Sequence, residues 1–322
     1  MMKVAILDDY LGLSQSVADW SPLAGRAQVT VLNRPLSLDQ AAEVLKDFEI
    51  LCTLRERQPF PRSLIQSLPK LRYICVTGKR YDSVDIPAAA ESNVMVSTTP
   101  VAGAGAGGVA ELTWGLILAL ARHIAREDRL MRSGGWQHEA GTTLRGKRLG
   151  VVGLGSIGSD VARIGQCFGM DVAAWSPNLT SERALEHGVS AVAKAELFAT
   201  SDFVTIHLAL SESTRNVVGA EELEAMKGSA RLVNTARAGL LDEEALIAAL
   251  RNKRIAGAAL DVFSVEPLPV NHVLRRLENA LITPHLGYFT REMLTSYYTY
   301  AVQNISAFLD GTPIRLVSPV TV

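Results

Sequence analysis

Two series of short apolar runs alternate with helix-length segments along the chain, and a stretch rich in glycine and alanine separates them. Runs of β-branched and apolar residues that alternate with helical patterns predict βαβ units and a parallel sheet. The stretch at residues 101–108 interrupts the alternation, so we place a domain boundary there. The expected strands are 4–7, 28–32, 50–54, 72–76 and 94–97, then 149–152, 171–175, 190–192, 203–207, 231–235, 256–261 and 281–283.

Two long segments outside these strands also have helical patterns. Residues 109–132 predict one long helix whose middle is nearly all apolar, which indicates burial on most faces, either inside the protein or against a second subunit. Residues 291–309 predict a closing helix that stops at Gly311-Thr312-Pro313. Several runs of the second series are continuously apolar, as in strands covered by helices on both faces. The predicted class is α/β with doubly wound parallel sheets.

Composition and charge narrow the functional classes. With 322 residues, 48% of them hydrophobic, the chain is long enough for two globular domains. A net charge of -1 gives no footprint for nucleic acid. Three scattered cysteines argue against a disulfide framework or a zinc site, so we expect no metal and a reducing, cytoplasmic setting. The N-terminal apolar run is too short for a signal peptide, and no apolar run approaches the about 20 residues that span a membrane.

The pattern Gly-x-Gly-x-x-Gly occurs twice, at Gly103/Gly105/Gly108 and at Gly153/Gly155/Gly158. A dinucleotide site needs a strand before the turn, a helix after it and a second strand about 20 residues on. Only the second copy has all three, because the helix after Gly108 runs too far. We therefore expect a hinge or helix-entry loop at the first copy. At the second we expect a cofactor site that includes Ser156 and Ile157, whose amides begin the helix.

The strand that should reach the cofactor ribose ends Trp175-Ser176-Pro177-Asn178 and carries no acid there. NAD-specific sites place an Asp or Glu at this point to bind the 2'-hydroxyl. Asp171 lies at the start of the strand, the wrong end for that contact. Ser176 and Asn178 can donate to a 2'-phosphate, so we expect NADP to be accepted and modestly preferred over NAD. The alternative is that these two residues bind only the 2'-hydroxyl.

Three later strands each end in unusual polar residues, which should converge at the carboxyl edge of one sheet. The segments are Val233-Asn234-Thr235-Ala236-Arg237, the run from Leu260 to Pro267 that holds Asp261 and Glu266, and Thr283-Pro284-His285-Leu286-Gly287. Taken singly, Arg237 could be a surface cation, Glu266 a solvated loop acid and His285 a core histidine. Together with the glycine motif at 153–158, these segments resemble the D-isomer-specific 2-hydroxyacid dehydrogenase family.

The resemblance covers nearly the whole chain and implies roles. Arg237 would bind the carboxylate and carbonyl of a 2-oxo acid, for which a guanidinium offers a planar fork of donors. His285 would be the acid and base, with Glu266 orienting its ring and favouring the imidazolium. In this family the function is interconversion of 2-oxo acids and D-2-hydroxy acids by hydride transfer with NAD(P).

Further residues follow from the same resemblance. Asp261 would face the nicotinamide carboxamide, Thr235 would also line the cofactor, and His207 ends a strand from which it could touch the cofactor. In the first domain, the backbone around Thr77, Gly78 and Lys79 would bind the substrate carboxylate, with Lys79 a departure from the family pattern. Arg55 ends a first-domain strand and is expected either beside the substrate or as a solvated charge.

The resemblance also implies the organisation. Residues 1–100 with 287–322 would form a flavodoxin-like substrate domain and residues 101–286 the dinucleotide-binding Rossmann domain, with a cleft between them that closes on the substrate. A homodimer is expected, with 109–132 at its interface. The rival is a nucleotide-sensing, co-repressor-like protein, which the set Arg237, Glu266 and His285 disfavours. Formate-oxidising relatives are disfavoured because they have glutamine where Glu266 stands. Glyoxylate, hydroxypyruvate, phosphohydroxypyruvate and bulkier 2-oxo acids all stay open as substrates.

Overall fold

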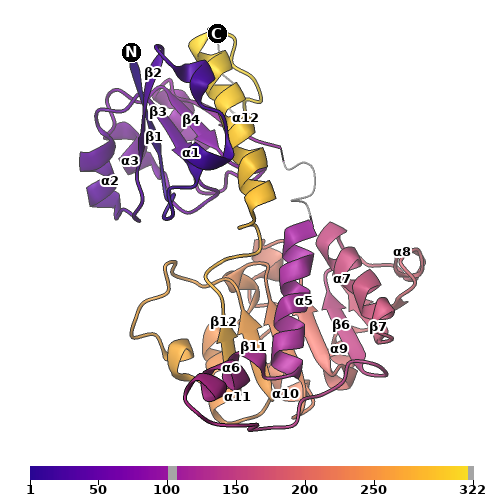
Figure 1. Cartoon of the computed structure of the whole chain (residues 1–322). Coiled ribbons are helices and arrows are strands. Elements are labelled where there is room, and N and C mark those ends of the chain that lie inside the picture. Colours follow the sequence, from indigo (N-terminus) through magenta and orange to yellow (C-terminus); the bar gives the residue numbers. More distant parts are fainter. Residues whose placement is uncertain (101–106, 318–322) are drawn as a thin grey trace. The chain divides into compact units, whose positions relative to one another are not determined.

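A computed structural model describes residues 1–100 and 107–317, and its contacts divide the chain into two units (Figure 1). Unit 1 comprises Met1–Ala106 and Phe289–Val322, and unit 2 comprises Gly107–Tyr288. Each unit contains one parallel sheet with helices on its faces, which confirms the predicted fold class. Gly103 and Gly105 of the first glycine motif lie outside the described residues, so the expected hinge stays a prediction.

Unit 1 has a five-stranded sheet in the order β2-β1-β3-β4-β5. The chain leaves β1 in one direction and β3 in the other, so the strand order reverses between these two strands. The strands are β1 (Met2–Ile6), β2 (Ala27–Val31), β3 (Ile50–Thr53), β4 (Tyr73–Val76) and β5 (Met95–Thr98). The helices are α1 (Ser14–Val17), α2 (Leu38–Leu45), α3 (Arg62–Gln66), α4 (Ile86–Glu91) and α12 (Arg291–Leu309).

The helix α12 comes from the far end of the chain and packs on the unit 1 sheet, next to α1 and β4. The ring of Phe308 stacks on that of Tyr73, with centroids 4.5 Å apart. The buried Asn304 side chain donates to Ser97 Oγ (3.1 Å) and to the Thr98 carbonyl oxygen (3.0 Å). These contacts make the end of the chain part of the unit 1 core.

Unit 2 has a seven-stranded sheet in the order β12-β11-β10-β9-β6-β7-β8. The order reverses between β6 and β9, and ligands of open α/β sheets bind at such a point. The strands are β6 (Arg148–Val152), β7 (Asp171–Trp175), β8 (Ser190–Ala191), β9 (Phe203–Ile206), β10 (Arg231–Asn234), β11 (Gly257–Leu260) and β12 (Ala280–Ile282). The helices are α5 (Gly108–Ala121), α6 (Ile124–Arg132), α7 (Ser156–Cys167), α8 (Ser181–Leu185), α9 (Lys194–Thr200), α10 (Ala220–Ala225) and α11 (Glu243–Arg251).

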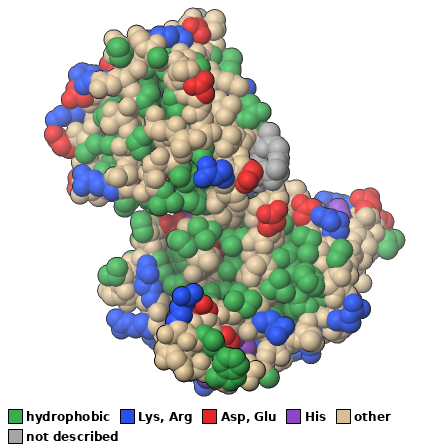
Figure 2. Space-filling model, viewed as in Figure 1, with side chains coloured by type: hydrophobic (Ala, Val, Ile, Leu, Met, Phe, Trp, Pro, Cys, Tyr) green, Lys and Arg blue, Asp and Glu red, His purple; other side chains and the backbone are tan. Residues whose placement is uncertain are grey.

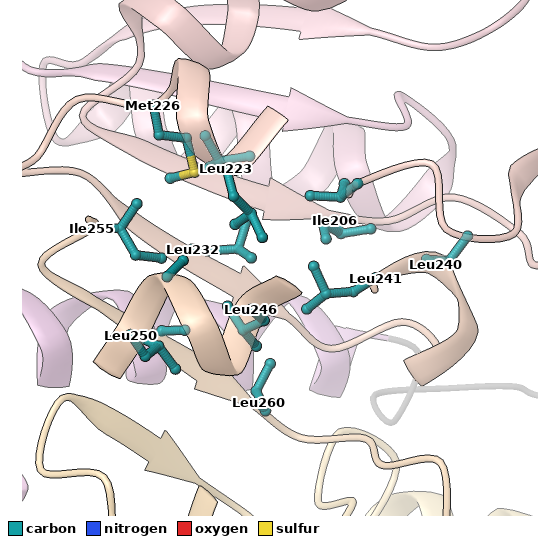
Figure 3. Packing of buried hydrophobic residues seen from close by; sticks show 14 of the residues in the cluster. Ile206, Leu223, Met226, Leu232, Leu240, Leu241, Leu246, Leu250, Ile255 and Leu260 are labelled. Atoms are coloured by element: carbon teal, nitrogen blue, oxygen red, sulfur yellow. The ribbon is translucent and has the colours of Figure 1, made fainter. Parts of the chain in front are cut away.

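In the core of unit 2, apolar residues spaced one helical turn apart on α11 pack against the sheet. Asp242 caps α11 by accepting a hydrogen bond from the Ala245 amide (3.1 Å). Leu246 and Leu250 are one turn apart on α11, so both face the sheet and meet Leu232 of β10 and Leu260 of β11 (Figure 3). Full burial of each such side chain stabilises the fold by about 1.5–3 kcal/mol.

The expected single helix over 109–132 is wrong. The helix ends at Ala121, and His123 adopts a left-handed backbone (φ 52°), so α5 and α6 are bent by 62°. Leu116 and Leu120 of α5 are buried in the core of their own unit, where α5 packs on α7, β10 and β11. The core of unit 2 therefore accounts for the burial of Leu116 and Leu120, and the expected subunit interface over 109–132 stays a prediction.

In the part of the chain that the structure describes, no single helix is long and apolar enough to cross a membrane. Only α5 and α6 taken together reach that length and composition, across their sharp bend.

Candidate active site

The second glycine motif forms the turn between β6 and α7, beside the point where the strand order reverses. Gly153 has a φ of +102°, and a Cβ there would lie 2.7 Å from the Leu208 amide nitrogen. A Cβ on Gly158 would lie 1.9 Å from the Gly153 carbonyl oxygen. A Cβ on Gly155 would have no protein atom within 4 Å. Two glycines thus allow close backbone packing, and the third borders open space.

This turn fits the pyrophosphate of a dinucleotide. Ser156 and Ile157 begin α7, and the preceding Gly155 offers no side chain to cap the first amides of this helix. Helix N-termini with uncapped amides favour anions through their N–H groups and the helix dipole. The open space at Gly155 lets an anion approach these amides closely.

The residues expected near the ribose lie at the end of β7. Ser176 Oγ accepts a hydrogen bond from the Leu154 amide (3.1 Å), which leaves the hydroxyl hydrogen able to donate. Asn178 is exposed two residues later. Asp171 lies at the opposite edge of the sheet, where its carboxylate contacts Arg148 at 3.5 Å. Within 174–178 there is no carboxylate to meet a ribose.

His207 follows β9 and is half-buried, with its Nδ1 atom inaccessible to solvent. Its Nε2 lies 2.8 Å from Thr205 Oγ1, and its Nδ1 has no hydrogen-bond partner among the described residues. Burial lowers the pKa of His207 to about 3, so the ring is neutral near pH 7. A neutral, partly unsatisfied ring next to the glycine turn is suited to a polar cofactor group, and the expected contact of His207 with the cofactor stays a prediction.

The buried His207 gives a testable pH dependence. The folded protein holds this ring neutral, whereas the unfolded chain protonates it near pH 6.5, so its contribution is lost as pH falls from about 6.5 towards 3. The expected loss is on the order of a few kcal/mol. Denaturant unfolding of the wild type and of His207→Gln, measured from pH 7 to pH 4, should show a flatter profile for the variant. Parallel profiles would contradict this assignment.

Asp261 fixes the segment that carries His285. Its carboxylate accepts hydrogen bonds from Thr283 Oγ1 (2.6 Å), the Leu286 amide (2.7 Å) and the Gly287 amide (2.9 Å). Burial raises the pKa of Asp261, and the three hydrogen bonds oppose that shift. These donors lie on both sides of His285 in the chain. The expected contact of Asp261 with a carboxamide stays a prediction.

The histidine and the acid named from the sequence lie in contact. His285 Nδ1 is 2.7 Å from Glu266 Oε2, while Glu266 Oε1 accepts a hydrogen bond from the Phe263 amide (2.9 Å). The His285 backbone is left-handed (φ 55°), and its ring meets the Tyr288 ring edge-on at 5.3 Å. The side chains of His285 and Glu266 remain 24% and 29% exposed, so a substrate can reach them. With Nδ1 bound to the acid, Nε2 is the nitrogen left to exchange a proton with substrate.

Arg237 and Thr235 follow β10 on the same edge of the sheet. Asn234 shapes this turn, because its side chain donates to the Arg237 carbonyl (3.0 Å) and accepts from the Ala236 amide (3.0 Å). Arg237 is half-buried and its Nη1 donates to the Ala236 carbonyl (2.8 Å). Thr235 Oγ1 lies 2.8 Å from the hydroxyl of Thr113 on α5, so this residue also ties α5 to the sheet.

The unit 1 residues form a separate cluster at the carboxyl edge of their own sheet. The Arg55 amide donates to Thr77 Oγ1 (2.9 Å), and the Arg55 guanidinium donates to the Tyr297 hydroxyl (3.1 Å). Gly78 has a φ of +90°, and a Cβ there would collide with the Arg55 guanidinium. The Gly78 amide already donates to Thr99 Oγ1 (2.7 Å), so it is not available to a substrate in this arrangement. Lys79 follows directly in the chain.

The sequence does not reveal the residues that fix the positions of the candidate site residues by hydrogen bonding to them. Asn234 stands in the sequence only as one member of the segment 233–237, although its side chain fixes the turn before Arg237. Thr283 and Thr113 were not singled out, although each bonds a residue that was. The sequence does offer one signal for such residues, a polar residue at the end of an apolar strand, and Asn234 fits it.

Comparison with known proteins places the chain in a family. Residues 114–287 match the model for the NAD binding domain of D-isomer specific 2-hydroxyacid dehydrogenases. A D-3-phosphoglycerate dehydrogenase of Synechocystis is 36% identical over 291 residues, covering 90% of this chain and 52% of the relative. The chain thus spans about half the length of that relative. A hydroxypyruvate reductase of Thermotoga maritima is 36% identical over 275 residues, covering 84% of this chain and 88% of the relative.

A solved structure agrees with the sequence relatives. The phosphoglycerate oxidoreductase of Vibrio cholerae superposes with a TM-score of 0.91 at 37% identity, covering 97% of this chain and 100% of that one. The family model covers more than half of the chain, including the glycine turn, Arg237, Glu266 and His285. The chain therefore belongs to the D-isomer specific 2-hydroxyacid dehydrogenase family, whose matched domain binds a nicotinamide cofactor.

Proposed function

We propose that this protein interconverts small 2-oxo acids and D-2-hydroxy acids, with Arg237, Glu266 and His285 as its catalytic residues. The observation that carries the proposal is the contact of 2.7 Å between His285 Nδ1 and Glu266, on the sheet edge that also holds the glycine turn. Family membership supports the reaction class. The named relatives act on different acids, which is why the proposal stops at the class of substrate.

Each residue has a defined task in reduction. The Arg237 guanidinium binds the substrate carboxylate and polarises the carbonyl by donating hydrogen bonds. A nicotinamide cofactor held at the glycine turn would supply the hydride for the carbonyl carbon. His285 Nε2 then gives its proton to the oxygen, which would otherwise carry the negative charge of an alkoxide. The Glu266 carboxylate orients the ring through Nδ1 and stabilises the imidazolium before transfer.

Turnover of a 2-oxo acid distinguishes an enzyme from a nucleotide-sensing binding protein of the same fold. A panel of 2-oxo acids of increasing size, assayed with both reduced cofactors, tests this directly. Steady oxidation of cofactor with at least one acid is the expected result. Cofactor binding without turnover of any acid in the panel would favour the sensor.

We propose that NADP is accepted and modestly preferred. The support is the absence of a carboxylate in 174–178 together with the donors Ser176 and Asn178. Arg183 is exposed in the first turn of α8, and Thr180 caps that helix by accepting from the Arg183 amide (3.3 Å). The neighbouring Glu182 offsets part of this positive charge, so we expect the preference to be small.

The cofactor prediction is tested by binding and by rate. NADPH should bind as tightly as NADH or up to about tenfold more tightly, and kcat/KM should follow the same order. Ser176→Asp should weaken NADPH binding by about tenfold or more while sparing NADH, because the new carboxylate repels a 2'-phosphate. Ser176→Ala is the control without charge. A wild-type preference for NADH of about a hundredfold would contradict the proposal.

We also propose a homodimer whose contact uses α6 and the segment after it. Ile124 and Met131 are 53% and 51% exposed on α6, and Trp136 is 74% exposed five residues further on. Large apolar side chains gathered on one segment are typical of an association surface. Leu116 and Leu120 of α5 are buried within unit 2, so the proposed contact uses the exposed residues of α6 and of the segment after it.

Trp136→Glu combined with Met131→Glu should convert the dimer to a monomer at micromolar concentration, as measured by sedimentation velocity. A charge introduced into an apolar contact must be desolvated without a partner, which opposes association. Leu185→Glu on α8, which replaces an exposed leucine (75%) outside this segment, is the matched control and should remain dimeric. A wild type that sediments as a monomer at the same concentration would remove the proposal.

A further inference from the structure

The loop at residues 263–271 carries Glu266, and its own backbone does little to fix its position. Within unit 2, all of which is described, these residues take part in one hydrogen bond between backbone groups, from the His272 amide to the Pro269 carbonyl (3.0 Å). Pro267 and Pro269 have no N–H group to donate. Because an unbonded backbone keeps its conformational freedom, contacts from outside the loop must set the position of Glu266.

The Arg275 side chain supplies such contacts. Its Nη2 donates to the Leu268 carbonyl (2.7 Å) and its Nε to the Pro269 carbonyl (2.9 Å), and we call these two hydrogen bonds the Arg275 clamp. The planar fork of a guanidinium restrains two consecutive peptide groups at once. The Leu268 side chain enters the core at the same point. Figure 2 shows several Lys and Arg side chains on the visible face of unit 2, so the clamp, and not exposure, distinguishes Arg275.

The backbone that carries Arg275 is itself anchored. Arg275 lies in a 3₁₀ turn, η5 (Val273–Arg276), in which Leu274 is buried in the core of unit 2. His272 precedes this turn, and its Nδ1 accepts a hydrogen bond from the Leu274 amide (3.4 Å). Its Nε2 lies 3.4 Å from Glu243 Oε1 on α11. The clamp therefore ties the loop to a turn that is fixed to the core and to α11.

His285 and Glu266 are thus held by different residues. Asp261 bonds the backbone amides that follow His285. Glu266 moves with its own loop, because its Oε1 accepts from the amide of Phe263 in the same loop (2.9 Å). The distance of 2.7 Å between Glu266 Oε2 and His285 Nδ1 therefore depends on where the loop lies, and the Arg275 clamp acts on that loop.

We propose that Arg275 is a positioning residue for catalysis, which keeps Glu266 within hydrogen-bond distance of His285 by clamping two carbonyls of the Glu266 loop. The inference rests on the proposed function, in which these two residues move the proton. Arg275 acts through Glu266 and not on the substrate. A displacement of about 1 Å can cost a catalytic group about a hundredfold in rate, so loss of the clamp should be measurable.

Arg275→Met should lower kcat for 2-oxo acid reduction by about tenfold and leave KM for the reduced cofactor unchanged. Its reduction rate should begin to fall at a lower pH than in the wild type, because a displaced carboxylate stabilises the imidazolium less. Arg275→Lys keeps the charge but lacks the fork, so its rate should lie between the two. Arg276→Met removes the next exposed arginine of the turn, and this matched control should behave as the wild type does.

A double-mutant cycle separates positioning from general stabilisation of the fold. All rates are measured well below the unfolding midpoint of each variant. In the Glu266→Gln background, Arg275→Met should lower kcat by no more than about twofold, since the charge that the clamp positions is already gone. Effects of the two substitutions that simply multiply would show that Arg275 does not act through Glu266, and would overturn the proposal.

A spectroscopic measurement without substrate tests the clamp apart from the proposed function. In protein labelled with 15N-histidine, the Nδ1 signal of His285 is identified by its loss in His285→Ala. Arg275→Met should move this signal towards its position in Glu266→Gln. If the wild type turns over no 2-oxo acid while the signal moves, the proposed function fails and the clamp stands. If the enzyme is active but both the signal and the pH profile of Arg275→Met match the wild type, the clamp is overturned.

Discussion

Replacing His285 with alanine should lower kcat for 2-oxo acid reduction by about a hundredfold to ten-thousandfold, the usual scale for a lost general acid. His285 contacts Glu266 through Nδ1 and is partly exposed, so its removal should leave the fold intact. Cofactor binding, measured by protein fluorescence, should be unchanged, because the glycine turn and α7 are untouched. Turnover within about threefold of the wild type would contradict the assignment.

Glu266→Gln separates orientation from proton transfer. Glutamine can still contact Nδ1, but it no longer pairs a negative charge with the imidazolium. Reduction should therefore begin to slow at a lower pH than in the wild type, while the rate at the acidic end of the profile is largely kept. Identical pH profiles would show that the contact of 2.7 Å between His285 and Glu266 does not act on the proton.

The second large effect is expected from a matched pair of glycine substitutions in the turn after β6. Gly158→Ala places a Cβ 1.9 Å from the Gly153 carbonyl oxygen, so the start of α7 must move. Such overpacking costs about 1–3 kcal/mol of unfolding free energy and should disrupt cofactor binding as well. Gly155→Ala meets no protein atom within 4 Å and should leave the unfolding free energy unchanged.

The difference between the two variants identifies the cofactor side of the turn. Gly155→Ala should weaken NADPH and NADH binding by about tenfold or more, because its methyl group enters the space open to a pyrophosphate. Unfolding in denaturant and cofactor titration of both variants check the pair. A Gly155→Ala protein that binds both cofactors normally would show that the pyrophosphate does not lie beside this residue.

Most strands of the fold can be predicted from the pattern of apolar and polar residues in short stretches of the sequence. The strands of both sheets begin and end within about two residues of the expected positions, because strands buried on both faces give short apolar runs between polar turns. The break at His123 could not be predicted, because a left-handed histidine in a helical pattern leaves no signal in periodicity. The sequence also cannot show whether Leu116 is buried inside its own unit or against a second subunit, because an apolar helix face is compatible with both.

The candidate catalytic residues can be picked out from the sequence, because their residue types alone indicate the chemistry they are suited to. Arg237, Glu266 and His285 follow strands and have side chains suited to acid–base work on a carboxylate substrate. The supporting contacts depend on tertiary structure. Asp261 was expected to face a cofactor, and only the structure shows that it holds the backbone on both sides of His285. The occupied Gly78 amide depends in the same way on Thr99, which is distant in the sequence.

The return of α12 to unit 1 has a consequence for biosynthesis. Asn304 and Phe308 complete the core around Tyr73 and Ser97, yet they are translated after all of unit 2. On the ribosome, unit 2 can close its sheet while one face of the unit 1 sheet is still bare. The half that is made first should therefore finish folding last, and a nascent chain paused near residue 290 should present an apolar surface to chaperones.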